Sequence, residues 1–369
     1  MKKILFLSPL PPPHYGSAMS SEICLDILNN SKKFEVKNIR LNFSKEMRDI
    51  GHLNFAKIKG FFEVRKKIAQ SIKESKLDLV YFVPATSSLG FIRDYLFWKQ
   101  IRKYYLGKII FHIRSRVLNK DWNNVSFRKR FTNMLNYQKV IVLGKELVPD
   151  IHEIIPEKNI FILPNAIKNE ISEEEFKKII SERKKRNSLN ILFLSNLDFS
   201  KGWPKLLESC RILKNRNFDF KCNFVGEFPG QKEKRFFFNF VNKNNLENNV
   251  FYLGKKTGSE KNKILMGSDV LVFPTEYPLE TFGRVILEGM MFGLPVIANG
   301  IATIPSIIDD GKTGFVLKEN SPKEISEKII LFQDNKIREK FGKEGRKKFI
   351  KNYELNNYRK KFIKIIESS

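Results

Sequence analysis

Short apolar runs alternate along the chain with longer segments in which apolar residues recur every three or four positions. In the first half, the short runs are residues 4–7, 77–83, 108–112, 139–143 and 160–163. Segments with helical spacing, among them residues 55–72 and 91–105, lie between them. Continuous apolar runs are typical of strands buried on both faces, and strands that alternate with helices indicate a parallel sheet.

A charged segment, residues 172–187, interrupts this alternation, and we expect either a linker-associated helix or an exposed excursion there. The alternation then restarts, with apolar runs at residues 191–195, 220–225, 250–253, 270–273 and 295–298. The pattern predicts an α/β protein with two doubly wound, Rossmann-like domains. We place them at residues 1–168 and 169–350, followed by a helix at residues 351–369 that crosses back to the first domain.

Composition excludes several classes of protein. Hydrophobic residues make up 42% of the 369 residues, enough to fill two cores, so global disorder is excluded. Cys24, Cys210 and Cys222 lie far apart, which argues against a disulfide framework and fits a reducing compartment. No apolar run approaches the roughly 20 residues of a membrane-spanning helix, so we expect no integral membrane protein.

The formal net charge of +27 suggests an anionic partner, either nucleic acid or a membrane surface, or else a compositional bias. Residues 1–165 and 166–369 are both basic, so bias explains part of the excess. Residues 51–150, however, hold 20 basic against 7 acidic side chains. Their helical segments mix apolar and basic positions. Such helices either dock on anionic lipid or cover the sheet with their charges in water.

The densest chemical signal follows the apolar run 270–273. Glu280 lies in the loop, Phe282, Gly283 and Arg284 open a predicted helix, and Glu288 lies on its second turn. A glycine at a helix start lets backbone N–H groups approach an anion. Two carboxylates beside a phosphate site favour a sugar nucleotide as ligand, because its hydroxyls can donate hydrogen bonds to them. The alternative is a helix N-terminal acid and a solvated glutamate.

The stretch from Glu280 to Glu288, followed by Gly293-x-Pro295, resembles the Glu-x7-Glu signature of glycosyltransferase family 4. The resemblance implies a GT-B fold, with the two domains facing across a cleft, and a retaining, metal-independent transferase that needs no cofactor. It also implies that Glu288 grips the donor ribose, Glu280 contacts the donor sugar, and the turn of Phe282 and Gly283, with Arg284, holds the diphosphate.

Further matches to this family are looser. Lys201 aligns with a lysine that neutralises the diphosphate, whereas Asn196 stands where the family has arginine; Arg284 or Lys255 are candidates to compensate. The resemblance also implies donor-binding roles for several loop residues. It implies catalytic roles for Glu280, Lys201 and His112, with His14 a weaker candidate. The implied loop residues are Gly16, Ser17, Gly226, Leu253 and Lys255. Ser17 departs from the usual second glycine.

The resulting hypothesis is a glycosyltransferase of hexosyltransferase type. It would move a sugar from a UDP- or GDP-sugar to a glycan or lipid-linked acceptor in bacterial-type surface polysaccharide synthesis. We expect it in the cytoplasm, docked through residues 51–150 on the inner membrane face, with no nucleic acid as partner. The alternatives are a GT-B epimerase or phosphorylase and, from another class, a basic nucleic-acid-binding protein, which charge alone suggests.

Overall fold

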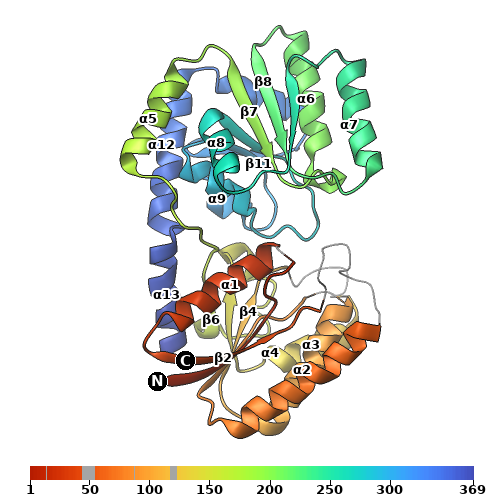
Figure 1. Ribbon diagram of the computed structural model, residues 1–369, viewed down its shortest axis with the longest axis vertical. Helices are drawn as coiled ribbons and strands as arrows, with labels where there is room; N and C mark the ends of the chain where they lie inside the picture. Colours follow the sequence, from red (N-terminus) through yellow and green to blue (C-terminus); the bar gives the residue numbers. More distant parts are fainter. Residues whose placement is uncertain (14, 44–54, 87, 117–122) are drawn as a thin grey trace. The chain divides into compact units, whose positions relative to one another are not determined.

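The computed structural model describes residues 1–13, 15–43, 55–86, 88–116 and 123–369. Contacts divide the chain into two units, Met1–Asn165 with Tyr358–Ser369, and Ala166–Asn357. Within the described ranges, each unit is built on one six-stranded parallel sheet with helices on both faces (Figure 1). The predicted fold class, two doubly wound α/β units, is confirmed.

The first unit has the strand order β2-β1-β3-β4-β5-β6. Its strands are β1 (Lys2–Ser8), β2 (Phe34–Arg40), β3 (Leu79–Phe82), β4 (Ile109–Ile113), β5 (Lys139–Val142) and β6 (Ile160–Ile162). Its helices are α1 (Gly16–Asn29), α2 (Phe55–Glu74), α3 (Ser88–Tyr104) and α4 (Val125–Leu135), joined by α13 (Leu355–Glu367) from the end of the chain. The strand order reverses at β1, so right-handed crossovers put α1 on one face and α2, α3 and α4 on the other.

The second unit has the strand order β12-β11-β10-β7-β8-β9. Its strands are β7 (Leu189–Leu194), β8 (Phe220–Val225), β9 (Val250–Gly254), β10 (Val270–Phe273), β11 (Val296–Asn299) and β12 (Gly314–Leu317). Its helices are α5 (Glu173–Lys184), α6 (Trp203–Asn215), α7 (Gln231–Lys243), α8 (Gly258–Gly267), α9 (Arg284–Met291), α10 (Ile304–Ile307), α11 (Pro322–Leu331) and α12 (Asn335–Asn352). Here the reversal lies between β7 and β10, which is where such sheets bind ligands.

The charged segment at residues 172–187 is not an exposed excursion. It forms α5, whose start is fixed by a reciprocal capping box between Ser172 and Glu175. Phe176 and Ile179 are buried, and the buried Arg183 donates to the carbonyl of Phe292 at 2.9 Å. The helix therefore belongs to the packed second unit, and its many charges lie on its outer side.

The last helix, α13, completes the first unit. Tyr358 is buried beside Cys24, with 3.0 Å between Oη and Sγ, and the Phe362 ring packs edge-on against Tyr81. At its end, Lys2 Nζ donates to the carbonyl oxygens of Ile366 and Ser369 at 3.0 and 2.7 Å, and so satisfies groups that a helix C-terminus leaves free.

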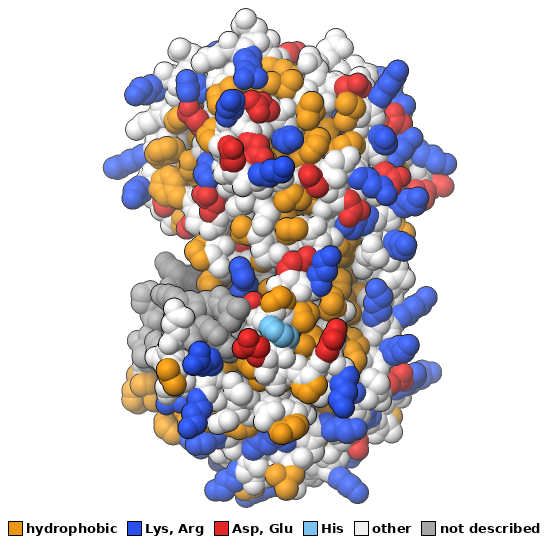
Figure 2. Space-filling view, turned by 180° about the vertical axis from the view of Figure 1, so that it is seen from behind, with side chains coloured by type: hydrophobic (Ala, Val, Ile, Leu, Met, Phe, Trp, Pro, Cys, Tyr) orange, Lys and Arg blue, Asp and Glu red, His pale blue; other side chains and the backbone are white. Residues whose placement is uncertain are grey.

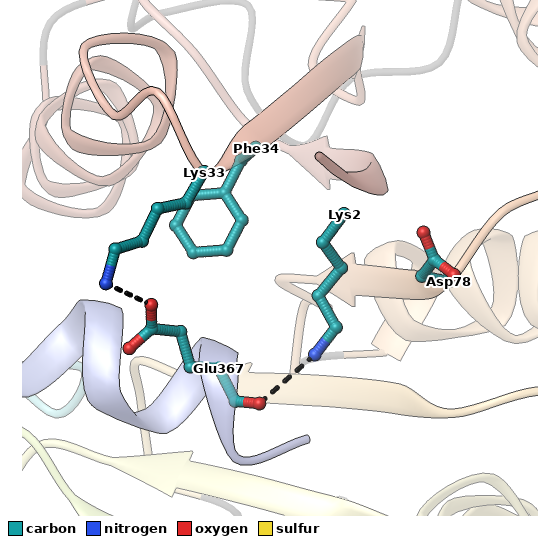
Figure 3. A pocket seen from close by; sticks show the side chains of 5 residues that line it. All are labelled: Lys2, Lys33, Phe34, Asp78 and Glu367. Carbon is teal, nitrogen blue, oxygen red and sulfur yellow. Dashed lines mark hydrogen bonds and ion pairs between the residues drawn. The ribbon is translucent and has the colours of Figure 1, made fainter.

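A hollow of about 440 Å³ lies beside this contact, lined by Lys2, Lys33, Phe34, Asp78 and Glu367 (Figure 3). Burial, followed by repulsion from Lys108, lowers the pKa of Lys2. The hollow lies at the amino ends of β1 and β2, opposite the edge where parallel sheets bind ligands. Lys2 and Lys33 are already bonded to the end of α13, so we regard the hollow as part of the helix attachment.

A polar cluster interrupts the apolar core of this unit. His112, on β4, is completely buried, and its Nδ1 lies 2.5 Å from Tyr81 Oη and 3.4 Å from Arg114 Nη2. Arginine only donates, so Nδ1 accepts and the ring proton lies on Nε2, which has no partner among the described residues. Burial, reinforced by the Arg114 charge, holds the pKa of His112 well below its ordinary 6.5.

This buried histidine predicts acid sensitivity. Below pH 6.5 the unfolded chain binds a proton at His112 that the folded chain does not bind. The free energy of unfolding therefore decreases as the pH is lowered. The expected slope is about 1.4 kcal/mol per pH unit from this one group. Urea unfolding between pH 5 and 8 should show this slope in the wild type and its loss in His112→Gln. Above pH 7.5 the two curves should run parallel; equal slopes below pH 6.5 would contradict the prediction.

Candidate active site

The candidate site of the second unit is built at the carboxyl ends of its central strands. Because the strands are parallel, the loops after β7, β8 and β10 leave the sheet at one edge. The N–H of Leu197 donates to the carbonyl of Glu227 at 2.9 Å, and that of Glu276 to Ser200 at 2.7 Å. These backbone bonds tie each loop to its neighbour, so that side chains on different loops keep fixed positions.

Two glycines make this close loop packing possible. A Cβ on Gly202, whose φ is +77°, would lie 1.9 Å from the carbonyl oxygen of Pro274. A Cβ on Gly226 would lie 1.8 Å from that of Ser195. Any side chain at either position would push the loops apart. Gly226 is thus a structural requirement of the site. The close approach of Gly202 to Pro274 brings Lys201, the residue before Gly202, toward the loop after β10.

Glu280 lies at the centre of the site, between a lysine and a helix start. Gly283 caps α9 with φ +67°, and its N–H donates to Glu280 Oε1 at 3.1 Å. Lys201 Nζ donates to the other oxygen, Oε2, at 2.9 Å. The carboxylate therefore rests on a positive helix terminus and a lysine together, which is the arrangement that binds anions.

The surroundings of Lys201 hold it in this place. Its Nζ lies 4.0 Å from the centre of the Tyr277 ring, a cation–π contact, and its side chain is only 16% exposed. Glu280 is similarly shielded, at 15%. Burial, followed by the Glu280 charge, raises the pKa of Tyr277, so its hydroxyl stays protonated at neutral pH. The Lys201–Glu280 pair is thus mostly screened from solvent and stronger than a surface ion pair.

Glu288, the second carboxylate of the motif, has a lysine of its own. It lies on α9, and its Oε1 accepts from Lys261 Nζ of α8 at 2.8 Å. Both carboxylates that the sequence analysis singled out are therefore half-buried and each is neutralised by one lysine. Neither acid is therefore left with an uncompensated charge.

The remaining residues expected in the second unit are less enclosed. Asn196 is exposed, Leu253 is half-buried on β9, and Lys255 forms a solvent-exposed pair with Glu227 at 3.4 Å. Phe282 is buried, with its ring edge-on to Tyr353, and Arg284 begins α9. In the described ranges, no group of three or more His, Cys, Asp or Glu side chains is arranged to hold a metal ion.

The first unit carries the other expected residues. Gly16 and Ser17 begin α1, and, apart from its own stretch of chain, no atom of the described residues lies within 4 Å of the place that a Cβ on Gly16 would take. His112 does not close its strand as expected, because β4 continues to Ile113, and the ring is fully buried. Its catalytic role stays a prediction. His14 lies outside the described residues.

The sequence analysis missed two residues, Lys261 and Tyr277. The chain carries lysines almost everywhere, and nothing in the local pattern around Lys261 separates it from its exposed neighbour Lys263. Tyr277 lies in the loop that carries Glu280, three residues before it. An aromatic residue at this place in the sequence could have indicated a contact with the site.

Comparisons with known proteins agree with this geometry. Residues 172–348 match the family model "Glycosyl transferases group 1". The chain is 25% identical over 301 residues to an uncharacterized 41.2 kDa protein in the cps region of Klebsiella pneumoniae, covering 79% of this chain and 80% of that protein. It is 25% identical over 148 residues to the putative colanic acid biosynthesis glycosyltransferase WcaL of Escherichia coli, covering 39% of this chain and 36% of that protein.

A solved structure shows the same fold over the whole chain. HepE of Anabaena, solved in complex with UDP and glucose, superposes with a TM-score of 0.73 at 16% identity and covers 100% of both chains. The α/β architecture, the paired Glu280 and Glu288 and the family match over residues 172–348 agree with one another. The chain therefore has the GT-B fold and is a glycosyltransferase, and its residues 172–348 are similar to the group 1 glycosyltransferases.

Proposed function

We propose that this glycosyltransferase moves a sugar from a UDP- or GDP-sugar, with retention and without a metal ion, to a glycan or lipid-linked acceptor of a surface polysaccharide. The observation that carries the proposal is the Glu280 carboxylate held between Lys201 and the N–H of Gly283. The relative in colanic acid biosynthesis and the neighbour solved with UDP and glucose support the acceptor and donor classes.

The chemistry requires a leaving diphosphate to be stabilised as its bond to the sugar breaks. Lys201 and the first N–H groups of α9 offer positive charge there, the role that a metal ion plays in other transferases. Glu280 accepts hydrogen bonds from both groups in the structure, so the diphosphate competes with a carboxylate that then turns to the sugar hydroxyls. The acceptor hydroxyl attacks from the face that the nucleotide leaves, which gives retention.

The donor proposal predicts a separation of binding from turnover. Glu280→Gln frees Lys201 for the diphosphate but weakens the contact with the sugar. We expect kcat to fall about 100-fold, while the affinity for the nucleotide diphosphate stays equal or rises. The measurement is a thermal-shift screen with UDP-, GDP- and ADP-sugars, followed by kinetics with the donor that stabilises the protein.

Glu276→Gln is the matched control, since Glu276 lies in the same loop but pairs with Lys205 and is half exposed. It should keep wild-type kinetics. No stabilisation by any of the three donors would refute the donor class, and a Glu280→Gln protein that loses nucleotide binding would refute the role of Glu280.

We also propose that the protein works at the cytoplasmic membrane face, docked through α2 and α3. These helices pack side by side in Figure 1, and Figure 2 shows hydrophobic side chains exposed beside basic ones on this unit. On α3 the exposed positions Ile92, Leu96, Lys99 and Lys103 follow one stripe, apolar near the helix start and basic beyond it. In the described ranges, no helix is long and apolar enough to cross a membrane.

The stripe on α2 has the same order. Phe55, Ile58 and Phe62 are exposed near its start, and Lys66 and Lys73 follow. Because α2 and α3 each follow a parallel strand, their first turns lie at the edge of the sheet where ligands bind. A membrane that buries the exposed apolar side chains at the starts of α2 and α3 and attracts their lysines would bring a lipid-linked acceptor to that edge of the sheet.

Vesicle sedimentation tests the docking. Vesicles with anionic lipid should bind the protein, and neutral vesicles should bind it about tenfold less. Changing Lys66, Lys73 and Lys99 to Glu should abolish the difference, since each lysine near an anionic surface contributes about 1 kcal/mol.

The control changes three exposed lysines of the second unit, Lys221, Lys234 and Lys243, to Glu and alters the net charge equally. It should keep the preference for anionic vesicles. Equal loss in both triple variants would mean that net charge, and not α2 and α3, drives the binding.

A further inference from the structure

Lys261 and Glu288 form an ion pair that joins two helices at the candidate site. The pair is 2.8 Å long, and its side chains are 25% and 20% exposed. The nearby pair of Lys255 and Glu227 is 3.4 Å long, with both side chains about two-thirds exposed. An exposed pair of that kind contributes little and exchanges freely with water. The Lys261–Glu288 pair is shielded, so it fixes the carboxylate in one orientation.

This contact uses only half of the Glu288 carboxylate. Lys261 bonds to Oε1, whereas Oε2 receives no hydrogen bond from the described residues and is not sealed from solvent. An ionised carboxylate has about four acceptor positions. Glu288 thus keeps acceptor positions open for a ligand with two adjacent hydroxyls, which is what a ribose offers and a 2′-deoxyribose does not.

The lysine also removes an electrostatic penalty. A nucleotide diphosphate is anionic, and an unpaired carboxylate at its ribose would repel it through a site that water only partly screens. Lys261 cancels that charge while leaving the acceptor oxygen available. The compensation matters here because Asn196, an uncharged side chain, stands in the loop after β7.

We propose that Lys261 is a positioning residue: it holds Glu288 for the ribose diol and so makes the site selective for ribonucleotides over 2′-deoxyribonucleotides. The inference rests on the proposed nucleotide-sugar function. Lys261 acts through Glu288, so its loss affects donor binding and the choice of pentose far more than the rate of transfer from a saturating donor.

The experiment compares binding of UDP with 2′-deoxy-UDP, and of GDP with 2′-deoxy-GDP, by calorimetry. The wild type should prefer the ribonucleotide about tenfold, the value of one charge-assisted hydrogen bond. Lys261→Met and Glu288→Gln should each bind both forms within about twofold of one another, and the double variant should lose nothing further. KM for the donor should rise in Lys261→Met while kcat changes less than about threefold.

Two further variants separate positioning from folding. Lys261→Arg keeps a charged donor and should restore most of the preference, and Lys263→Met removes an exposed lysine of the same helix and should change nothing. Melting temperatures check that each variant is folded; if Lys261→Met is not, Lys261→Gln takes its place. A preference retained without Lys261, or absent from the wild type, overturns this inference alone. A wild type that binds no nucleotide overturns the proposed function as well.

Discussion

The second unit depends on the compensation of negative charge at a place that, in the proposed function, also receives an anion. Glu280 and Glu288 lie on the same short stretch of chain, at the start of one helix, and neither is left unpaired. Lys201 comes from the loop after β7 and Lys261 from α8, so residues 201–288 must be folded before both carboxylates are neutralised. The charge balance is therefore a property of the assembled strand edge and cannot exist in an isolated segment.

Backbone geometry makes that balance possible. Lys201 reaches Glu280 because the turn at Gly202 lies directly on the carbonyl of Pro274. Gly283 turns the chain so that its own N–H donates to the Glu280 carboxylate. Helix α9 begins at the next residue. The positive-φ glycines Gly202 and Gly283 thus determine the positions of the charged side chains, although they have no reactive group of their own.

The sequence predicted those parts of the molecule whose pattern is local. Residues 270–273 were identified with their observed bounds because they are continuously apolar, and residues 220–225 because apolar side chains dominate that run. The edge strand β2 was missed because polar residues dominate Phe34–Arg40, and α5 was ambiguous because its charges hide three buried apolar positions. The motif located Glu280 and Glu288, but their partners depend on which lysine the fold brings near. The surroundings of His112 likewise depend on distant segments, because its partner Tyr81 lies on β3 and packs against Phe362 of α13.

The return of α13 to the first unit has a consequence for the order of folding. The second unit is one continuous segment, Ala166–Asn357, whereas the first is completed by Tyr358–Ser369. During synthesis, the partner of Cys24 and the ring that packs on Tyr81 emerge only after the whole second unit. The apolar face that α13 covers therefore stays exposed until contacts between residues 334 positions apart form, and such non-local contacts form slowly. The second unit, with its paired glutamates, can be complete before the first.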